Sequence, residues 1–172
     1  MDNKQFIKLA RESINEEFTG KKPSIPHDRE LNEKRGVFVT LTRHGELRGC
    51  IGFPYPIYTL GEAIIKAAKA AGFSDPRFPP LGEREFPEVR VEISVLSVPE
   101  KAKPEEIEIG KDGLMCEYQG FSGLLLPQVA VEYKMNKEGF LRALCQKAGL
   151  PSDSWKKRDF KLWKFQAEII KE

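Results

Sequence analysis

Apolar residues at helical spacing near the start of the chain predict a first helix. The apolar stripe runs from Phe6 to Phe18 and stops before Gly20, a residue type that often follows the last turn of a helix. Asp2, with Gln5 three residues later, predicts a capping box at the start of this helix. The stripe consists of Phe6, Leu9, Ala10, Ile14 and Phe18.

Two further helices are predicted from their caps. The first of them covers residues 60–71, begins at a capping box opened by Thr59 and ends at Gly72. Its apolar face is made largely of alanine, which suits close packing against a sheet. The other covers residues 137–148 and is capped by Asn136.

Runs of β-branched and aromatic residues, or alternation of apolar and polar residues, predict the strands. Residues 36–43 and 47–52 flank the pair His44-Gly45, and this pattern predicts a hairpin with a two-residue turn. The clearest alternation lies in residues 89–98, where four β-branched residues share one face. These four residues are Val89, Val91, Ile93 and Val95.

The second half of the chain predicts three more strands. Residues 114–118 and 123–126 are apolar runs that flank a turn at residues 119–122. Residues 128–133 fit a strand or a helix equally well. Residues 161–170 predict one final strand with a large apolar face. That face consists of Trp163, Phe165, Ala167 and Ile169.

Scattered strands with few helices, and without regular alternation of the two, predict the α+β class. We expect a largely antiparallel sheet flanked by helices. The chain has 172 residues, of which 40% are hydrophobic, so it is long enough to bury a substantial core. A single domain over residues 1–172 is the expected organisation.

Composition and charge argue against several classes of protein. The net charge of +2 gives no electrostatic reason to expect a nucleic acid or a membrane surface as partner. No apolar run reaches the roughly 20 residues of a membrane helix. The first residues lack the apolar core of a secretory signal. The three cysteines are odd in number and show no CxxC spacing, which indicates a reducing, cytoplasmic compartment.

The sequence also predicts neither a metal nor a cofactor. Its two histidines, His27 and His44, have no neighbouring ligands at metal spacing. The phosphate-binding and hydrolase signatures GxxxxGK, GxGxxG, HExxH and GxSxG are absent from the sequence.

The hexapeptide Leu-Arg-Gly-Cys-Ile-Gly at residues 47–52 concentrates chemically useful groups on one strand. Regular alternation places Arg48 and Cys50 on the same face, roughly 7 Å apart along the strand. Gly49 and Gly52 leave room for another backbone or a ligand. A nearby guanidinium favours the thiolate. The alternative interpretation is that Cys50 is a small core residue and that Arg48 lies at a sheet edge.

Two other segments carry candidate site residues. Asp75 and Arg77 lie in a proline-rich loop, which either forms a structural turn or presents an arginine beside a pocket. Glu92 and Ser94 lie on the polar face of the strand at residues 89–98, and they face Cys50 if the two strands share a sheet. Cys116 and Cys145 follow apolar patterns and are expected to pack in a core.

The hexapeptide resembles the signature of the AMME chromosomal-region (AMMECR) protein family. The resemblance extends from about Phe6 to Ile170, and further blocks occur in the family's order. These blocks are Asp75 with residues 77–80, then residues 92–96, 110–114, 124–130 and 140–141. Where similar proteins often carry histidine, this chain has Asp112, which weakens any role assigned to that position.

The resemblance implies a fold in two unequal lobes, with the hexapeptide near a cleft between them. Similar domains occur beside, or fused to, Memo-type proteins and radical-SAM enzymes. That context implies a redox or modification pathway in which such proteins are possible partners. The resemblance does not supply a reaction, because a fold can serve many activities.

Two functions remain open. The first is an enzyme, or an enzyme component, in which Cys50 is a nucleophile or covalent carrier and Glu92 moves protons. In this hypothesis Arg48 stabilises the thiolate or binds an anion. The weakness of the hypothesis is the missing histidine partner for the thiol, because His44 lies at the turn, away from Cys50. The substrate-binding candidates are Arg48, Ser94, Asp75, Arg77 and Gln128.

The second function is a binding or adaptor module. The hexapeptide strand and the proline-rich loop then form a docking groove, Cys50 is a small residue that fits, and Arg48 recognises a carboxylate.

Overall fold

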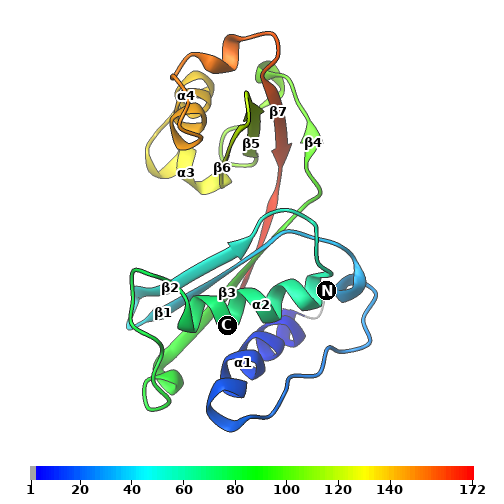
Figure 1. The fold of residues 1–172 in the computed structure, drawn as a ribbon, viewed down its shortest axis with the longest axis vertical. Helices are drawn as coiled ribbons and strands as arrows, with labels where there is room; N and C mark the ends of the chain where they lie inside the picture. The colour runs from blue at the N-terminus through cyan, green and yellow to red at the C-terminus, as the bar shows by residue number, and fades with distance from the viewer. Residues whose placement is uncertain (1–2) are drawn as a thin grey trace. The chain divides into compact units, whose positions relative to one another are not determined.

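The computed structural model describes residues 3–172, and the chain forms two compact units. The first comprises the chain up to Leu96 together with Glu168–Glu172, and the second is Ser97–Ala167 (Figure 1). Both units mix helices with antiparallel strand pairs, so the predicted α+β class is confirmed. The structure has two four-stranded sheets where the sequence predicted one. A cleft between two lobes stays a prediction.

In the first unit, two helices cover one face of a sheet with the strand order β2-β1-β3-β8. Alternate residues of β1 and β3 face the helices and are buried, from Val37 to Leu41 and from Val89 to Val95. The elements are α1 (Asn3–Thr19), η1 (Glu30–Asn32), β1 (Val37–Arg43), β2 (Glu46–Phe53), α2 (Leu60–Phe73), η2 (Phe86–Glu88), β3 (Val89–Leu96) and β8 (Ala167–Lys171).

Both predicted helices of this unit are present. The capping box of α2 is complete, because Thr59 and Glu62 each accept a hydrogen bond from the backbone N–H of the other. The prediction that Gly72 ends α2 is wrong. The helix continues to Phe73, and Gly72 is a buried helical residue near Leu81. The predicted cap at Asp2 lies outside the described residues.

The hairpin of β1 and β2 has the predicted two-residue turn. His44 and Gly45 both have positive φ, at 52° and 82°, as such a turn requires. A regular hairpin on this turn would pair Thr40 with Gly49. The observed register pairs Thr40 with Cys50, because one extra residue of β2, Arg48, is accommodated in a β-bulge.

The second unit contains a sheet of order β4-β7-β5-β6 covered by α4, whose cap at Asn136 is confirmed. Its elements are β4 (Glu100–Lys101), η3 (Pro104–Glu106), β5 (Gly113–Tyr118), β6 (Phe121–Leu125), α3 (Pro127–Glu132), α4 (Lys137–Lys147), η4 (Ser154–Lys156) and β7 (Lys161–Phe165). The ambiguous segment at residues 128–133 lies mostly in α3. The predicted turn at residues 119–122 is shorter, since only Gln119 and Gly120 form it.

The prediction of one final strand at residues 161–170 is wrong. The segment divides at Gln166 into β7 and β8, which belong to different sheets. The break shifts the alternation by one residue. Ile170 is therefore buried, whereas Ile169, assigned to the apolar face from the sequence, is 44% exposed.

The second unit contains two of the three cysteines and the buried Asp112. Cys116 and Cys145 lie in the core of the second unit, as predicted. Asp112 is buried and accepts a hydrogen bond from the backbone N–H of Glu108, which stabilises the turn before β5. Within residues 3–172, no helix has the length and apolarity needed to span a membrane.

The two glycines of the hexapeptide allow close packing inside the protein. A Cβ atom on Gly49 would lie 2.1 Å from the carbonyl oxygen of Ala71 in α2. A Cβ atom on Gly52 would overlap the ring of Phe38, at 2.2 Å. The space that the glycines provide is therefore filled by the α2 backbone and by an aromatic ring of β1.

We predict that Gly49→Ala lowers the free energy of unfolding by about 3 kcal/mol, the upper range for overpacking, because its Cβ meets backbone atoms. Urea denaturation measures this loss. Gly82→Ala is the matched control, since a Cβ atom at Gly82 meets nothing within 4 Å. Equal stability of the two variants would contradict the close packing of α2 on β2.

Candidate functional site

Cys50 lies on an edge strand, and a loop takes the place of the missing neighbouring strand. β2 is the outermost strand of its sheet. The backbone N–H of Cys50 donates to Oδ2 of Asp75 at 2.9 Å. The backbone carbonyl oxygen of Cys50 accepts from Nη2 of Arg77 at 3.3 Å. Both outward backbone groups of Cys50 are thereby satisfied, as an edge strand requires.

Asp75 and Arg77 also bind each other in a fork geometry. Nε of Arg77 donates to Oδ1 at 3.0 Å, and Nη2 donates to Oδ2 at 2.7 Å. The backbone N–H of Arg77 donates to Oδ1 as well, at 3.0 Å. We call this arrangement, comprising Asp75, Arg77 and the backbone of Cys50, the clasp. The Asp75 side chain is 2% exposed and the Arg77 side chain 55%, so the clasp has a buried anion and an accessible cation.

The clasp strongly perturbs the Asp75 carboxyl group. The side-chain hydrogen bonds of Arg77 hold its pKa well below the ordinary value, and the Cys50 N–H adds to that effect against the cost of desolvation. The pKa of the Arg77 guanidinium is raised by the same partner. Asp75 is thus a stable anion whose role is to hold Cys50 and Arg77 in place.

The thiol of Cys50 differs from the other two thiols in exposure. Cys50 is partly exposed, whereas Cys116 and Cys145 are buried. Burial raises the pKa of Cys116 to about 11 and also raises the pKa of Cys145. The Cys50 Sγ accepts a hydrogen bond from Oγ1 of Thr40 at 3.3 Å. Cys50 is therefore the most accessible of the three thiols.

Arg48 binds a carboxylate and makes no hydrogen bond to the thiol. Its Nε and Nη2 donate to the two oxygens of Glu85, the second at 3.1 Å, and these bonds lower the pKa of Glu85. Nη1 of Arg48 is buried and has no hydrogen-bond partner among residues 3–172. The sequence placed Arg48 and Cys50 on one face by regular alternation, but the bulge at Arg48 interrupts that alternation.

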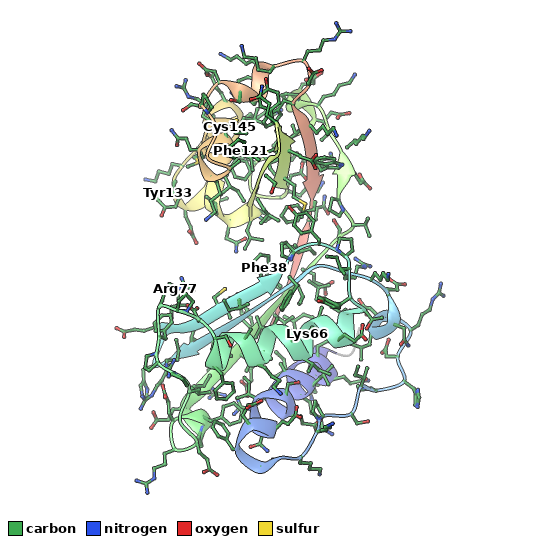
Figure 2. The ribbon with its side chains drawn as sticks, viewed as in Figure 1. Phe38, Lys66, Arg77, Phe121, Tyr133 and Cys145 are labelled. Atoms are coloured by element: carbon green, nitrogen blue, oxygen red, sulfur yellow. The ribbon has the colours of Figure 1, made fainter. Side chains whose placement is uncertain are left out.

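The ring of Phe78 links the two arginines of the site. The guanidinium carbon of Arg77 lies 5.6 Å from the ring centroid, and that of Arg48 lies 5.9 Å from it. Both distances are within the range of cation–π attraction. Phe78 therefore joins the loop of the clasp to the Arg48–Glu85 pair, and Figure 2 shows Arg77 beside β2.

Glu92 and Ser94 lie on β3, on the same sheet face as Cys50 but not in contact with it. The register aligns Cys50, Thr40 and Glu92 in one row, with Thr40 in the middle. Adjacent strands are about 4.8 Å apart, so the Cys50 and Glu92 backbones are separated by about 10 Å. Glu92 pairs with Lys171 at 3.2 Å. Ser94 is buried in the next row, opposite Phe38.

Gln128 belongs to α3 of the second unit. His44 is exposed at the hairpin turn, where its Nε2 lies 3.2 Å from Glu88. Within residues 3–172, no group of three or more His, Cys, Asp or Glu side chains is arranged to hold a metal ion.

Three residues of the site were not identified from the sequence. Thr40 was missed because the bulge changes its partner from Gly49 to Cys50. Glu85 was missed because it lies in a loop without a motif, and only the folded chain brings it to Arg48. Phe78 was noted only as part of the proline-rich loop, although an aromatic residue directly after Arg77 is compatible with a cation–π contact.

The fold and the site define a class of protein: an α+β chain with a partly exposed thiol on an edge strand held by an aspartate–arginine pair. The AMMECR1 family profile matches residues 7–170 of this chain. The chain therefore belongs to the AMMECR1 family, and the resemblance inferred from the hexapeptide is confirmed.

Related archaeal proteins match over nearly the whole chain. Protein TK0174 of Thermococcus kodakarensis is 48% identical, over 97% of this chain and 88% of its own length. Protein TV1384 of Thermoplasma volcanium is 46% identical, over 96% of this chain and 87% of its own length. The crystal structure of the uncharacterized protein PH0010 from Pyrococcus horikoshii superposes with a TM-score of 0.84 at 49% identity, and covers 95% of this chain and 88% of that one.

We predict that Asp75→Asn lowers the free energy of unfolding by about 1–3 kcal/mol at neutral pH, because a buried acceptor of charge-assisted hydrogen bonds is lost. The pKa of Asp75 is lower in the folded chain than its unfolded value of about 3.9. The stabilisation is therefore complete above that value and is lost as the pH falls toward the folded pKa. Urea denaturation at a series of pH values should show the wild-type advantage shrinking below about pH 4.

Glu88→Gln is the control for this experiment. Glu88 also pairs with an arginine, Arg43, but its side chain is 45% exposed. Exposed ion pairs contribute little to stability, so this variant should unfold almost like the wild type. A wild-type advantage over Asp75→Asn that does not change with pH would contradict the assigned charge state of Asp75.

Proposed function

We propose that this chain is an enzyme, or a component of one, in which the Cys50 thiol reacts with an electrophilic substrate and Arg77 binds an anionic group of that substrate. The observation that supports this proposal is the clasp. It holds the single partly exposed thiol of residues 3–172 beside a guanidinium that is 55% exposed. Arg77 donates through Nε and Nη2, so its Nη1 keeps its donors for a ligand.

The chemistry available at this site is nucleophilic addition or displacement by sulfur. In addition, the carbon–sulfur bond forms as a π bond of the substrate breaks, and the atom that gains its electron pair takes up a proton; in displacement, the bond to the leaving group breaks and that group departs with the electron pair. In both cases the thiol proton passes to a base. Within residues 3–172, neither a carboxylate nor an imidazole makes a hydrogen bond to the Cys50 sulfur; Thr40 does. The base for this step therefore comes from solvent, from the substrate or from a second protein.

The need for an external base supports the role of enzyme component. In this proposal the chain works with Memo-type and radical-SAM proteins, the partners that its family resemblance implies. Cys50 then acts as a covalent carrier, and Asp75 positions both the thiol and the anion-binding arginine. Gln128 and Ser94 remain substrate-binding candidates. Glu92, which Thr40 separates from Cys50, remains a candidate proton carrier for the bound substrate and not for the thiol.

A second candidate function is a non-catalytic binding module that uses the same surface. The observation that favours it is that Thr40, whose hydroxyl is not a general base, is the hydrogen-bond partner of the Cys50 sulfur, and no carboxylate or imidazole within residues 3–172 takes that place. The two functions differ in what they require of Cys50. If the chain is a binding module, the Cys50→Ser variant still binds its partner. If Cys50 is a covalent carrier, the same variant no longer forms the adduct with the substrate.

The anion-binding role of Arg77 is measurable with two alkylating reagents of similar size, iodoacetate and iodoacetamide, of which only the first is charged. We predict that the iodoacetate to iodoacetamide rate ratio at Cys50 falls about two- to fivefold in Arg77→Gln, the scale of an exposed ion pair. Peptide mass spectrometry reads the rates, and buried Cys116 and Cys145 serve as unreactive internal references.

Two variants control for loss of the clasp. Arg77→Lys keeps the charge and should keep most of the ratio. Arg84→Gln removes another exposed arginine and should leave the ratio unchanged. If Arg77→Gln keeps the wild-type ratio, Arg77 does not guide anions to the thiol. If Cys50 reacts no faster than the two buried cysteines, the proposal for Cys50 itself fails.

A further inference from the structure

A cavity of about 700 Å³ opens on the surface of the second unit, beside the segment that joins α4 to β7 (residues 148–160, orange in Figure 1). Its lining comes from two places along the chain. Tyr118 and Gln119 belong to the turn between β5 and β6, and the other lining residues lie within residues 150–157. The volume is in the range of small-molecule sites in proteins. The proposed function does not use this cavity.

The side chain of Ser154 is the first indication of a ligand. Ser154 is 4% exposed, and it lines the cavity. Its hydroxyl makes no hydrogen bond within residues 3–172. Buried hydroxyls in proteins are normally hydrogen-bonded, because a hydroxyl without a partner has lost water and gained nothing in return. The partner of the Ser154 hydroxyl is therefore expected in the cavity that the residue lines.

Backbone hydrogen bonds hold this serine in place. The N–H of Ser154 donates to the carbonyl oxygen of Pro151, and the N–H of Lys157 donates to that of Ser154, both at 3.0 Å. Nε2 of Gln146 in α4 donates to Oγ of Ser152 at 3.1 Å, which ties the segment to the helix. The hydroxyl is thus presented by a fixed turn, as a binding site requires.

The other polar groups of the cavity are mainly cations and hydrogen-bond donors. Lys157 is exposed, and its ammonium group has no partner within residues 3–172. Lys156 lies 3.7 Å from the carboxylate of Asp153, which is too long for a hydrogen bond. The Tyr118 hydroxyl accepts from Nε2 of Gln119 at 3.3 Å, so its own proton is left for another acceptor. Two ammonium groups against one carboxylate give the lining a positive balance, which favours an anion.

The rest of the lining is apolar and excludes a bare inorganic ion as the best ligand. Leu150, Pro151 and the ring of Tyr118 provide apolar surface in the cavity. A free phosphate or sulfate ion fills only a small part of this volume and gains nothing from apolar contacts. An organic anion gains from both kinds of surface, because burial of its apolar body adds to the pairing of its charge.

We propose that this cavity binds a small organic anion, a phosphate ester or a carboxylate with an aromatic or aliphatic body. The anionic group accepts a hydrogen bond from the hydroxyl of Ser154 and pairs with the ammonium groups of Lys156 and Lys157. The body of the ligand covers Leu150 and Pro151. The site lies in the second unit alone, so the proposal is independent of the clasp and of the proposed function.

Isothermal titration calorimetry and an amide NMR titration of the full chain test this proposal, with phenyl phosphate and benzoate as probes. Phenol, which lacks the charge, and inorganic phosphate, which lacks the ring, are the matched control compounds. We expect saturable binding of an anionic probe in the millimolar range, with shifts gathered in residues 118–119 and 150–157. Both control compounds should bind about fivefold more weakly or worse. The tighter anionic probe identifies the preferred anionic group.

Ser154→Ala should weaken binding of the tighter probe about tenfold, because a hydrogen bond to a charged group is lost. The variant should keep the full free energy of unfolding without ligand, because the deleted hydroxyl has no partner within residues 3–172. Ser152→Ala is the matched control. Ser152 is a serine of the same segment outside the cavity lining, so its loss should leave the affinity unchanged.

Lys157→Gln is a second test at an exposed position and should weaken binding about two- to fivefold, the scale of an exposed ion pair. Lys101→Gln removes an exposed lysine of β4, outside the lining, and should bind like the wild type. Absence of saturable binding of both anionic probes would overturn the proposal. So would a control compound that binds as tightly as the anionic probes, or a Ser154→Ala variant with wild-type affinity.

Discussion

The candidate site depends on one interaction, the hydrogen bonding of the Cys50 peptide groups by Asp75 and Arg77. An edge strand exposes polar backbone groups that need partners, and here a loop provides both an acceptor and a donor for one residue. The bidentate bond between Asp75 and Arg77 makes this loop rigid at the point of contact. The loop also carries Phe78, which reaches the Arg48–Glu85 pair.

The same interaction explains why the Cys50 backbone is held in place while the residue stays partly exposed. A neighbouring β-strand would have covered β2 along its whole length, whereas the clasp covers it at one residue. The Cys50 backbone is fixed between Asp75, Arg77 and β1, and its sulfur contacts Thr40. The buried anion at Asp75 keeps Arg77 in place without removing its guanidinium from solvent. A fixed thiol beside an accessible cation is the arrangement from which the proposed chemistry follows.

Local sequence signals predicted those elements that depend on local interactions. The Thr59 capping box, the His44-Gly45 turn and the Asn136 cap each involve residues within a few positions of one another. The bulge at Arg48 could not be predicted in this way. It shifts the register so that Cys50, and not Gly49, lies opposite Thr40, while Gly49 meets the α2 backbone at Ala71.

Long-range contacts account for the other differences between the sequence predictions and the structure. Residues 161–170 alternate like one strand, but β7 and β8 pair with strands of different sheets, and alternation alone does not specify a partner. For the site, the sequence identified Cys50, Asp75 and Arg77 but not their mutual hydrogen bonds. The sequence also predicted that Arg48 stabilises the Cys50 thiolate. In the folded chain the guanidinium of Arg48 instead binds the carboxylate of Glu85.

The candidate site rests on the hydrogen bond from the Cys50 amide to Asp75, and hydrogen exchange of that amide measures the bond. Gly52 provides an internal comparison, because its amide points to the same open side of β2 but has no partner within residues 3–172. The clasp predicts slow exchange at Cys50 and fast exchange at Gly52, with the difference abolished in Asp75→Asn. Equally fast exchange of both amides in the wild-type chain would contradict the clasp and the site built on it.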